Sequence, residues 1–197
     1  MILFKKILKW TGIVIGGVFI ILVIVRAFHF YNLDKTNAEV AKIHATKLTL
    51  DDVMGKNLPP DPGTEADKTV AGIDANNNGI RDDVELAVFK EYPNSAKTRA
   101  VLLQYALLLQ TEAIQPIINK DTATAISEDE SRAYNCIGTI VPKNNDDIQK
   151  IQAHLTFIED KQLNTTERKN IKKNFDNQTG SFELQRGCDV DISGLSN

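Results

Sequence analysis

One segment near the amino terminus constrains this chain more than any other. Residues 10–25, WTGIVIGGVFIILVIV, carry no charge and, apart from Thr11, no polar side chain. As a helix they would extend about 24 Å, which is shorter than the roughly 30 Å hydrocarbon core of a bilayer. Aromatic side chains, which favour the headgroup region, flank the segment: Trp10, Phe28, Phe30 and Tyr31. Arg26 is near enough to the edge to extend outward, so we expect residues 10–31 to contact and cross a lipid bilayer.

The charges are distributed unevenly around this segment. Residues 1–28 contain four basic and no acidic residues, which leaves 19 basic and 26 acidic residues in the rest of the chain. Positive charge before a span favours a cytoplasmic amino terminus, and Lys5, Lys6 and Lys9 supply it here. We therefore expect a cytoplasmic tip and a transmembrane signal-anchor in residues 1–31. The acidic body would then be periplasmic, or more generally extracytoplasmic, on a single-pass protein of the inner cell membrane.

A cleaved signal peptide is the alternative interpretation of the same segment. Val25 and Ala27 are small enough for the −3 and −1 positions of a cleavage site after Ala27. The apolar run is long for the hydrophobic region of a signal peptide, and no cluster of small residues follows it. These two features favour the uncleaved anchor. In either case the body is exported.

The rest of the chain is predicted to be all-α. Residues 32–73 are expected to form a stalk with a short helix over 33–45, followed by a Pro-rich linker. Residues 74–197 are expected to form a small helical bundle, because strand-like alternation is nearly absent from them. Five helices are predicted in the bundle, over residues 82–92, 95–114, 127–141, 145–160 and 164–177, with an extended tail after them.

Two of these helices carry particular expectations. Residues 95–114 are apolar nearly all round but are interrupted by Gln104 and Gln110, so they are predicted as the buried central helix rather than a second span. The next helix is predicted to begin at Ser127, because Ser127 and Glu130 have the spacing of a capping box.

The sharpest chemical pattern is DANNNGIRDDVE, residues 74–85. Calcium takes about six to eight oxygen ligands at roughly 2.3–2.6 Å, and alternate residues of a tight loop can supply them. Side-chain oxygens recur here at that spacing, with a glycine at the sixth position. The segment resembles the twelve-residue calcium-binding loop of the EF-hand family, particularly its NGIxDDxE variants in exported bacterial proteins.

The resemblance implies a role for each position of the loop. Side-chain oxygens would come from positions 1, 3 and 5, a backbone carbonyl from position 7, a direct or water-mediated contact from position 9, and a bidentate carboxylate from position 12. In this chain those six metal ligands are Asp74, Asn76, Asn78, Ile80, Asp82 and Glu85. Gly79 stands where the loop needs its sharp turn. The resemblance thus implies one Ca²⁺ site.

The loop departs from the EF-hand pattern in two ways. Arg81 stands where EF-hands usually have an aliphatic residue, and the segment before Asp74 does not predict an entering helix. The unit therefore resembles dockerin or thrombospondin-type calcium repeats, a loop with an exiting helix, more than a calmodulin-type pair. An Asn-Gly turn before an acidic helix start is the alternative, but it leaves the offsets of Asp74, Asn76 and Glu85 unexplained.

Cys136 and Cys188 are expected to form a disulfide, because an exported body meets oxidising conditions. Two buried thiols are the alternative. Residues 189–194 repeat the first six positions of the calcium loop without a twelfth-position acid, and they are interpreted as part of a docked extended tail. Two cysteines and three scattered histidines do not predict a zinc site.

No catalytic motif accompanies these features, and His154 has no nucleophile motif beside it, so we do not expect an enzyme. The acidic body argues against a nucleic-acid partner. Gly12 and Gly16 have GxxxG spacing, which would suit a weak homodimer, although glycine is common in membrane helices. We predict a membrane-anchored calcium-binding protein with a binding or structural role and an unidentified protein partner. A periplasmic immunity or inhibitor protein against a secreted toxin is the alternative.

Overall fold

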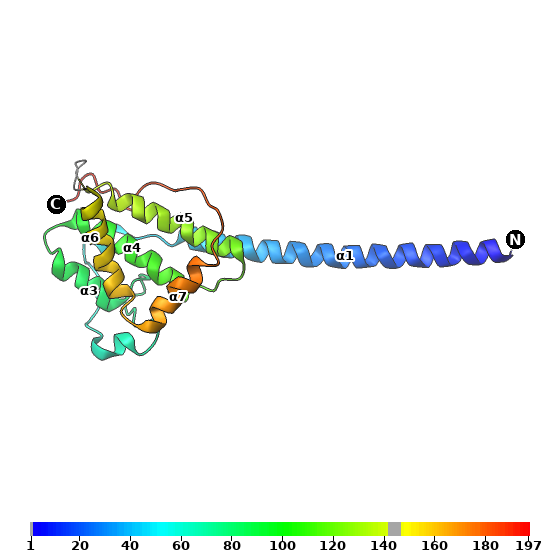
Figure 1. Cartoon of the computed structure of the whole chain (residues 1–197), viewed down its shortest axis with the longest axis horizontal. Coiled ribbons are helices and arrows are strands. Elements are labelled where there is room, and N and C mark those ends of the chain that lie inside the picture. The colour runs from blue at the N-terminus through cyan, green and yellow to red at the C-terminus, as the bar shows by residue number, and fades with distance from the viewer. Residues whose placement is uncertain (1, 142–146) are drawn as a thin grey trace. The chain divides into compact units, whose positions relative to one another are not determined.

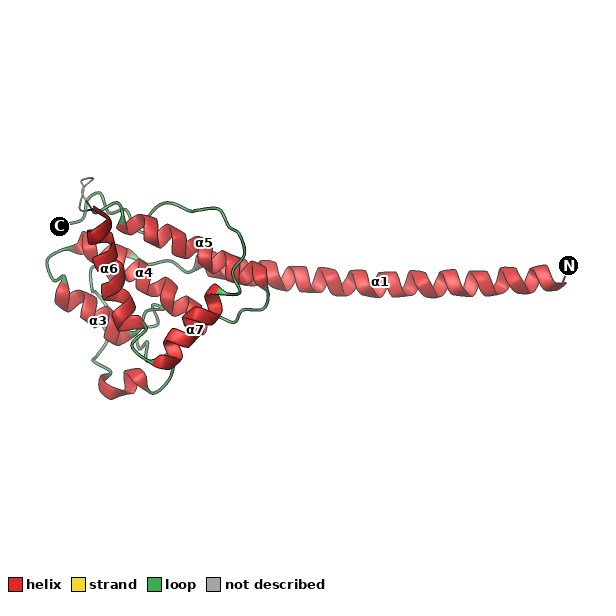
Figure 2. Cartoon of the chain, viewed as in Figure 1, coloured by secondary structure: helices red, strands yellow, loops and turns green. Residues whose placement is uncertain are grey.

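The structure is a computed structural model that describes residues 2–141 and 147–197. Its described residues form helices joined by loops and contain no strand, which confirms the all-α prediction (Figure 2). The elements are α1 Ile2–Ala45, α2 Leu50–Val53, the 3₁₀ helix η1 Gly63–Asp67, α3 Asp82–Glu91, α4 Ala96–Ile114, α5 Lys120–Ile137, α6 Asp147–Gln162 and α7 Thr166–Asp176. Contacts divide the chain into two units, which meet between residues 41 and 42.

The first unit consists of most of α1. This is the one helix in the described part of the chain that is long and apolar enough to cross a membrane, and a signal sequence would meet the same criterion. None of the side chains in its apolar window is buried. The helix continues without interruption through the predicted stalk helix at residues 33–45. Apart from the backbone of the helix itself and the adjacent residues, no described atom lies within 4 Å of the place a Cβ would take at Gly12 or Gly16, and the homodimer stays a prediction.

The second unit is built around α4. Figure 1 shows this helix lying among α3, α5, α6 and α7, and all four pack against it, as does α2. Sixteen of its 19 residues are buried, as predicted for a central helix. The buried amides of Gln104 and Gln110 bind non-helical segments: Gln104 Oε1 accepts from the backbone N–H of Asp189 at 2.9 Å, and Gln110 Nε2 donates to the carbonyl of Ala71 at 2.8 Å.

The predicted start of α5 at Ser127 is wrong. The helix begins at Lys120, because Asn119 and Thr122 form a capping box before it. Asn119 Oδ1 accepts from the backbone N–H of Thr122 at 3.1 Å, and Thr122 Oγ1 accepts from the backbone N–H of Asn119 at 3.3 Å. Ser127 lies inside the helix, where its hydroxyl donates to the carbonyl of Ala123 at 3.2 Å. A capping-box spacing thus has no capping role once the preceding turn is already helical.

The other predicted helices of the body agree more closely with the structure. α3, α4 and α7 begin and end within two residues of the predicted positions. The predicted helix 145–160 corresponds to α6, which ends at Gln162. Of the residues predicted to cap it, Asn145 and Asp146 lie outside the described part of the chain, and Asp147 is the first residue of the helix.

Buried arginines hold the predicted linker against the body. The linker contains α2 and η1, whose residues Val53 and Ala66 are buried. From α7, the guanidinium of Arg168 donates to the carbonyls of Ala66, Thr69 and Val70 at 2.6, 2.9 and 3.0 Å. It also binds the carboxylate of Asp67 at 2.6 Å. Because its backbone carbonyls have few partners within helices or sheets, such a segment needs donors of this kind when it is buried.

The carboxyl-terminal tail is also fixed to the body. The predicted disulfide is present: Cys136 of α5 is bonded to Cys188, with Cα atoms 5.1 Å apart. The next residue, Asp189, has a fully buried carboxylate that accepts from the backbone N–H of Leu48 at 3.0 Å and pairs with Arg132. Apolar side chains of the following residues pack against the core: Val190, Ile192 and Leu195. These contacts agree with the interpretation of residues 189–194 as a docked tail.

Candidate metal centre

The loop at residues 74–85 is folded by two residues in the left-handed region. Asn77 has φ 57° and Gly79 has φ 84°. The carboxylate of Asp74 lies inside the loop, where it accepts from the backbone N–H groups of Asn78 and Gly79 at 3.1 and 2.9 Å. Asn78 Oδ1 in turn accepts from the backbone N–H of Ile80 at 2.9 Å. The predicted ligand positions 1 and 5 therefore share the interior of a tight turn.

The first turn of α3 closes the loop. Glu85 is 1% exposed, and its Oε2 accepts from Asn76 Nδ2 at 3.0 Å. The carboxylate of Asp82, which is also buried, accepts from the backbone N–H of Ala75 at 3.0 Å. The predicted ligand at position 12 thus contacts the predicted ligand at position 3, and position 9 contacts the start of the loop. Coordination of one ion by residues from position 1 to position 12 requires the two ends of the loop to come together in this way.

Burial dominates the electrostatics of Glu85. It raises the pKa of this carboxyl from 4.5 to about 7; the amide of Asn76 opposes the rise, and the charges of Asp52 and Asp82 add to it. No ion pair links Glu85 to a basic side chain in the described part of the chain. A buried carboxylate is costly to ionise unless a cation compensates it. The position of Glu85 therefore favours a bound cation.

The chemistry of the remaining donors fits calcium. Among the described residues, no three His, Cys, Asp or Glu side chains form a group that would hold a metal ion by themselves. The loop's further donors are neutral oxygens, from the amides of Asn76 and Asn78 and from the carbonyl of Ile80. An oxygen that accepts one backbone N–H retains a second lone pair for a cation. Hard oxygen donors of mixed charge suit Ca²⁺, and binding itself stays a prediction.

The unusual Arg81 has a structural role. Its guanidinium is fully buried, binds the carboxylate of Asp83 at 2.6 and 2.8 Å, and donates to the carbonyls of Lys161 and Gln162, each at 3.1 Å. These carbonyls lie at the carboxyl-terminal end of α6. The adjacent Ile80 is fully buried in the core. The second half of the loop is therefore fixed to the body whether or not an ion is bound.

Two residues outside the loop belong to its surroundings and were not predicted. The carbonyl of Asn57 accepts from Asn76 Nδ2 at 2.9 Å, and Asp52 is near enough to Glu85 to raise its pKa. Both follow the end of α1 and lie 19 or more residues before their partners in sequence. No periodicity or motif connects such distant positions, so the sequence carries no signal for these two contacts.

His154, the histidine with no nucleophile motif beside it in the sequence, lies on α6. Its ring is half-buried, its Nδ1 is 3.5 Å from the hydroxyl of Tyr92, and burial lowers its pKa.

Comparisons of the chain with protein-family models, curated proteins and solved structures find no match. The interpretation of the site therefore depends on the residues of this chain alone.

Proposed function

We propose that this chain is a single-pass membrane protein whose amino terminus is cytoplasmic and whose extracytoplasmic helical body binds one structural Ca²⁺ ion in the loop at residues 74–85. The observation that carries the proposal is the place of Glu85. Its carboxylate is buried against Asn76, at the spacing of a bidentate ligand, with no basic side chain paired to it among the described residues. A calcium ion would supply the missing positive charge.

The contacts around the loop favour a structural role for the ion. One side of the loop is bonded to Asn57, in the segment that follows α2, and its other side continues into α3. An ion that binds Asp74, Asp82 and Glu85 would neutralise their mutual repulsion and hold this segment against the body. The role is non-catalytic, and the helical body is then available to bind a protein partner.

Calcium binding is tested by titration. We expect the full-length chain in detergent to bind one Ca²⁺ ion with a dissociation constant on the order of 10⁻⁴–10⁻³ M, as in extracellular modules. Glu85→Ala should abolish binding, because it removes the bidentate ligand. Glu91→Ala is the matched control, since Glu91 is an exposed acid on the same helix. Isothermal titration calorimetry in millimolar calcium measures both, and absence of a binding heat in the wild type would contradict the proposal.

The orientation is tested with a fusion at the carboxyl terminus. We expect a reporter enzyme that is active only outside the cytoplasm to be active when fused after Asn197. Replacing Lys5, Lys6 and Lys9 together with glutamate should reduce that activity, because these residues supply the positive charge that keeps the amino terminus inside. The exposed Lys56 and Lys68, replaced in the same way, serve as the control. Activity of a cytoplasm-specific reporter at Asn197 would reverse the proposed orientation.

A further inference from the structure

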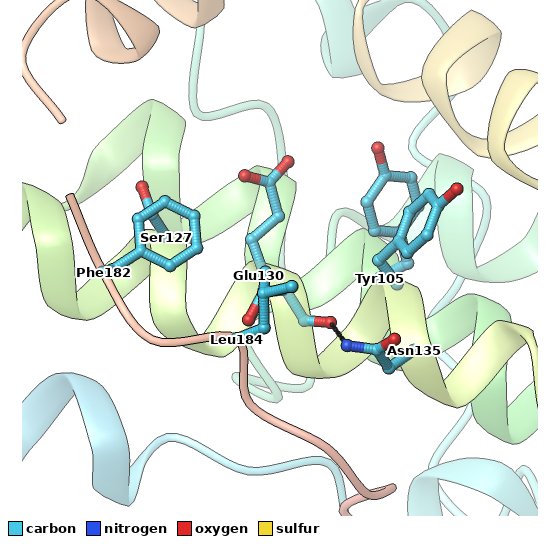
Figure 3. Close-up of a pocket in the computed structure, with 8 residues that line it drawn as sticks. Tyr105, Ser127, Glu130, Asn135, Phe182 and Leu184 are labelled. Atoms are coloured by element: carbon cyan, nitrogen blue, oxygen red, sulfur yellow. Dashed lines mark hydrogen bonds between the residues drawn. The ribbon is translucent and has the colours of Figure 1, made fainter. Parts of the chain in front are cut away.

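A cavity of about 290 Å³ lies between α4, α5 and the tail, and its lining includes none of the residues of the calcium loop. Its walls are largely aromatic or apolar, and they come from Tyr105, Tyr134, Phe182 and Leu184. Figure 3 shows Glu130 rising from α5 between Phe182 on one side and Tyr105 on the other. Of the described residues that line the cavity, Glu130 alone is charged.

Large apolar side chains remain exposed around this cavity. Tyr134 is 49%, Leu184 is 70% and Phe182 is 38% exposed. Phe182 and Leu184 belong to the tail segment that is tied to α5 by the backbone N–H of Gln185, which donates to Ser131 Oγ at 3.0 Å, and by the disulfide beyond it. The apolar wall is therefore held in place next to the opening. Exposed apolar surface around a polar group is typical of a ligand site.

Negative charge exceeds positive charge next to the cavity. Lys172 Nζ lies 2.9 Å from a carboxylate oxygen of Glu130, 2.8 Å from one of Glu112 and 3.1 Å from one of Asp176. A single ammonium group is therefore shared by three carboxyl groups. Glu112 is almost completely buried, and its Oε1 has no hydrogen-bond partner in the described structure. A fourth carboxylate, that of Glu159, accepts from the hydroxyl of Tyr105 at 2.8 Å. Burial raises the pKa of Glu112 and favours its neutral form, but Glu130 and Asp176 still share the one ammonium group of Lys172. This remaining excess of negative charge favours a further cation at the cavity.

We propose that this cavity binds a small organic cation: a primary amine with a short aromatic or apolar group. The ammonium group would bind Glu130, and the apolar part would lie against Tyr134 and Phe182. Aromatic faces attract an ammonium group as well as apolar carbon, so the walls and the carboxylate favour the same ligand. The volume is at the small end of the roughly 300–1,000 Å³ common for ligand sites, which excludes large molecules. The carboxylates would repel an anionic ligand.

The probe for this site is 2-phenylethylamine, measured by equilibrium dialysis against the full-length chain in lipid nanodiscs, with empty nanodiscs as the blank. We expect saturable binding, and we expect 2-phenylethanol and 3-phenylpropionate to bind about tenfold or more weakly because they lack the ammonium group. Saturable binding of the alcohol with equal affinity would overturn the proposal, as would absence of saturable amine binding up to about 5 mM.

Variants locate the binding in the cavity. Glu130→Gln keeps the shape of the side chain and should weaken amine binding about tenfold. Glu183→Gln is the matched control, because Glu183 is an exposed acid of the same tail segment and does not line the cavity. Tyr134→Ala changes a half-exposed side chain, so the body should remain folded by circular dichroism while amine binding falls. Unchanged affinity in folded Glu130→Gln or Tyr134→Ala would overturn the proposal.

Discussion

Replacing Arg168 with alanine is expected to lower the free energy of unfolding of the body by about 3 to 5 kcal/mol. Arg168 is 2% exposed, and its guanidinium donates to three backbone carbonyls within residues 66–70. Each buried carbonyl that loses its donor costs about 1–3 kcal/mol. Two side-chain partners, Asp67 and Asn164, also lose their bonds to Arg168, each of 2.6 Å. The loss therefore affects a whole segment that has few other hydrogen bonds.

Urea unfolding of the full-length chain in detergent, followed by circular dichroism, measures this loss. Arg168→Lys should recover a minor part of the stability, because one ammonium group cannot reach the carbonyls that the planar guanidinium contacts together. Lys169→Ala is the matched control: Lys169 is the exposed neighbour on the same helix, and its change should stay within about 0.5 kcal/mol. A loss below about 1 kcal/mol in Arg168→Ala would show that water replaces the guanidinium.

The elements of this fold that could be predicted are those whose signal is local. The long apolar run and the proline that follows it identify α4, and the predicted start of the last helix at residue 164 lies within two residues of α7, which Thr165 caps. The predicted start of α5 is wrong because two capping patterns begin eight positions apart, at Asn119 and Ser127, and the earlier one begins the helix. Local patterns therefore predict that a helix exists more reliably than where it begins.

Contacts between distant residues could not be predicted. Arg168 and the carbonyls that it binds are about a hundred positions apart, and nothing in the sequence marks this arginine as buried. A cluster of basic residues around it is typical of an exposed helix face, and its neighbour Lys169 has that place. The predicted linker is packed because buried arginines supply donors to its carbonyls. Composition alone cannot distinguish such a segment from a free tether.

The candidate site likewise has residues that the sequence predicts and contacts that it does not. Its predicted ligands are contiguous in sequence, so the spacing of residues 74–85 was enough to bring Asp74, Asn76 and Glu85 to one loop. Asn57 and the role of Arg81 depend on how α2 and α6 pack around that loop. An arginine at the eighth position was visible as a departure from the EF-hand pattern. Its partners, the last carbonyls of α6, were not.

In the absence of calcium, the stability of the body is expected to decrease as pH rises from about 5 to about 8. Burial raises the pKa of Glu85 to about 7 in the folded, ion-free chain, against 4.5 for an unperturbed glutamate. Well below pH 4.5 the carboxyl is protonated in both the folded and the unfolded chain, so it does not change the free energy of unfolding. As the pH rises, the unfolded chain releases the proton first, so the folded state loses stability until the pH exceeds 7. The full loss is roughly 3 kcal/mol, from 1.36 kcal/mol for each unit of pKa.

Thermal unfolding in excess chelator and in millimolar calcium, at pH 5 and pH 8, tests this expectation. Calcium requires the ionised carboxylate, so it should stabilise the chain far more at pH 8 than at pH 5. Other buried acids also change stability with pH, above all Glu112, whose pKa is raised first by burial and then by Glu130. Because Glu112 does not belong to the loop, its contribution is the same with and without calcium. The difference between the two conditions isolates the loop.

Glu85→Gln separates the destabilisation caused by the buried charge from the stabilisation caused by the ion. The variant keeps the size of the side chain and cannot ionise, so in chelator at pH 8 it should be more stable than the wild type. In about 1 mM calcium the difference should shrink by about 0.4–1.4 kcal/mol, because calcium stabilises the wild type whereas the variant has lost the proposed bidentate ligand. Glu91→Gln, an exposed acid on the same helix, should change neither value. If Glu85→Gln were less stable than the wild type in chelator at pH 8, the carboxylate would be compensated within the protein, and no cation would be needed to explain its burial.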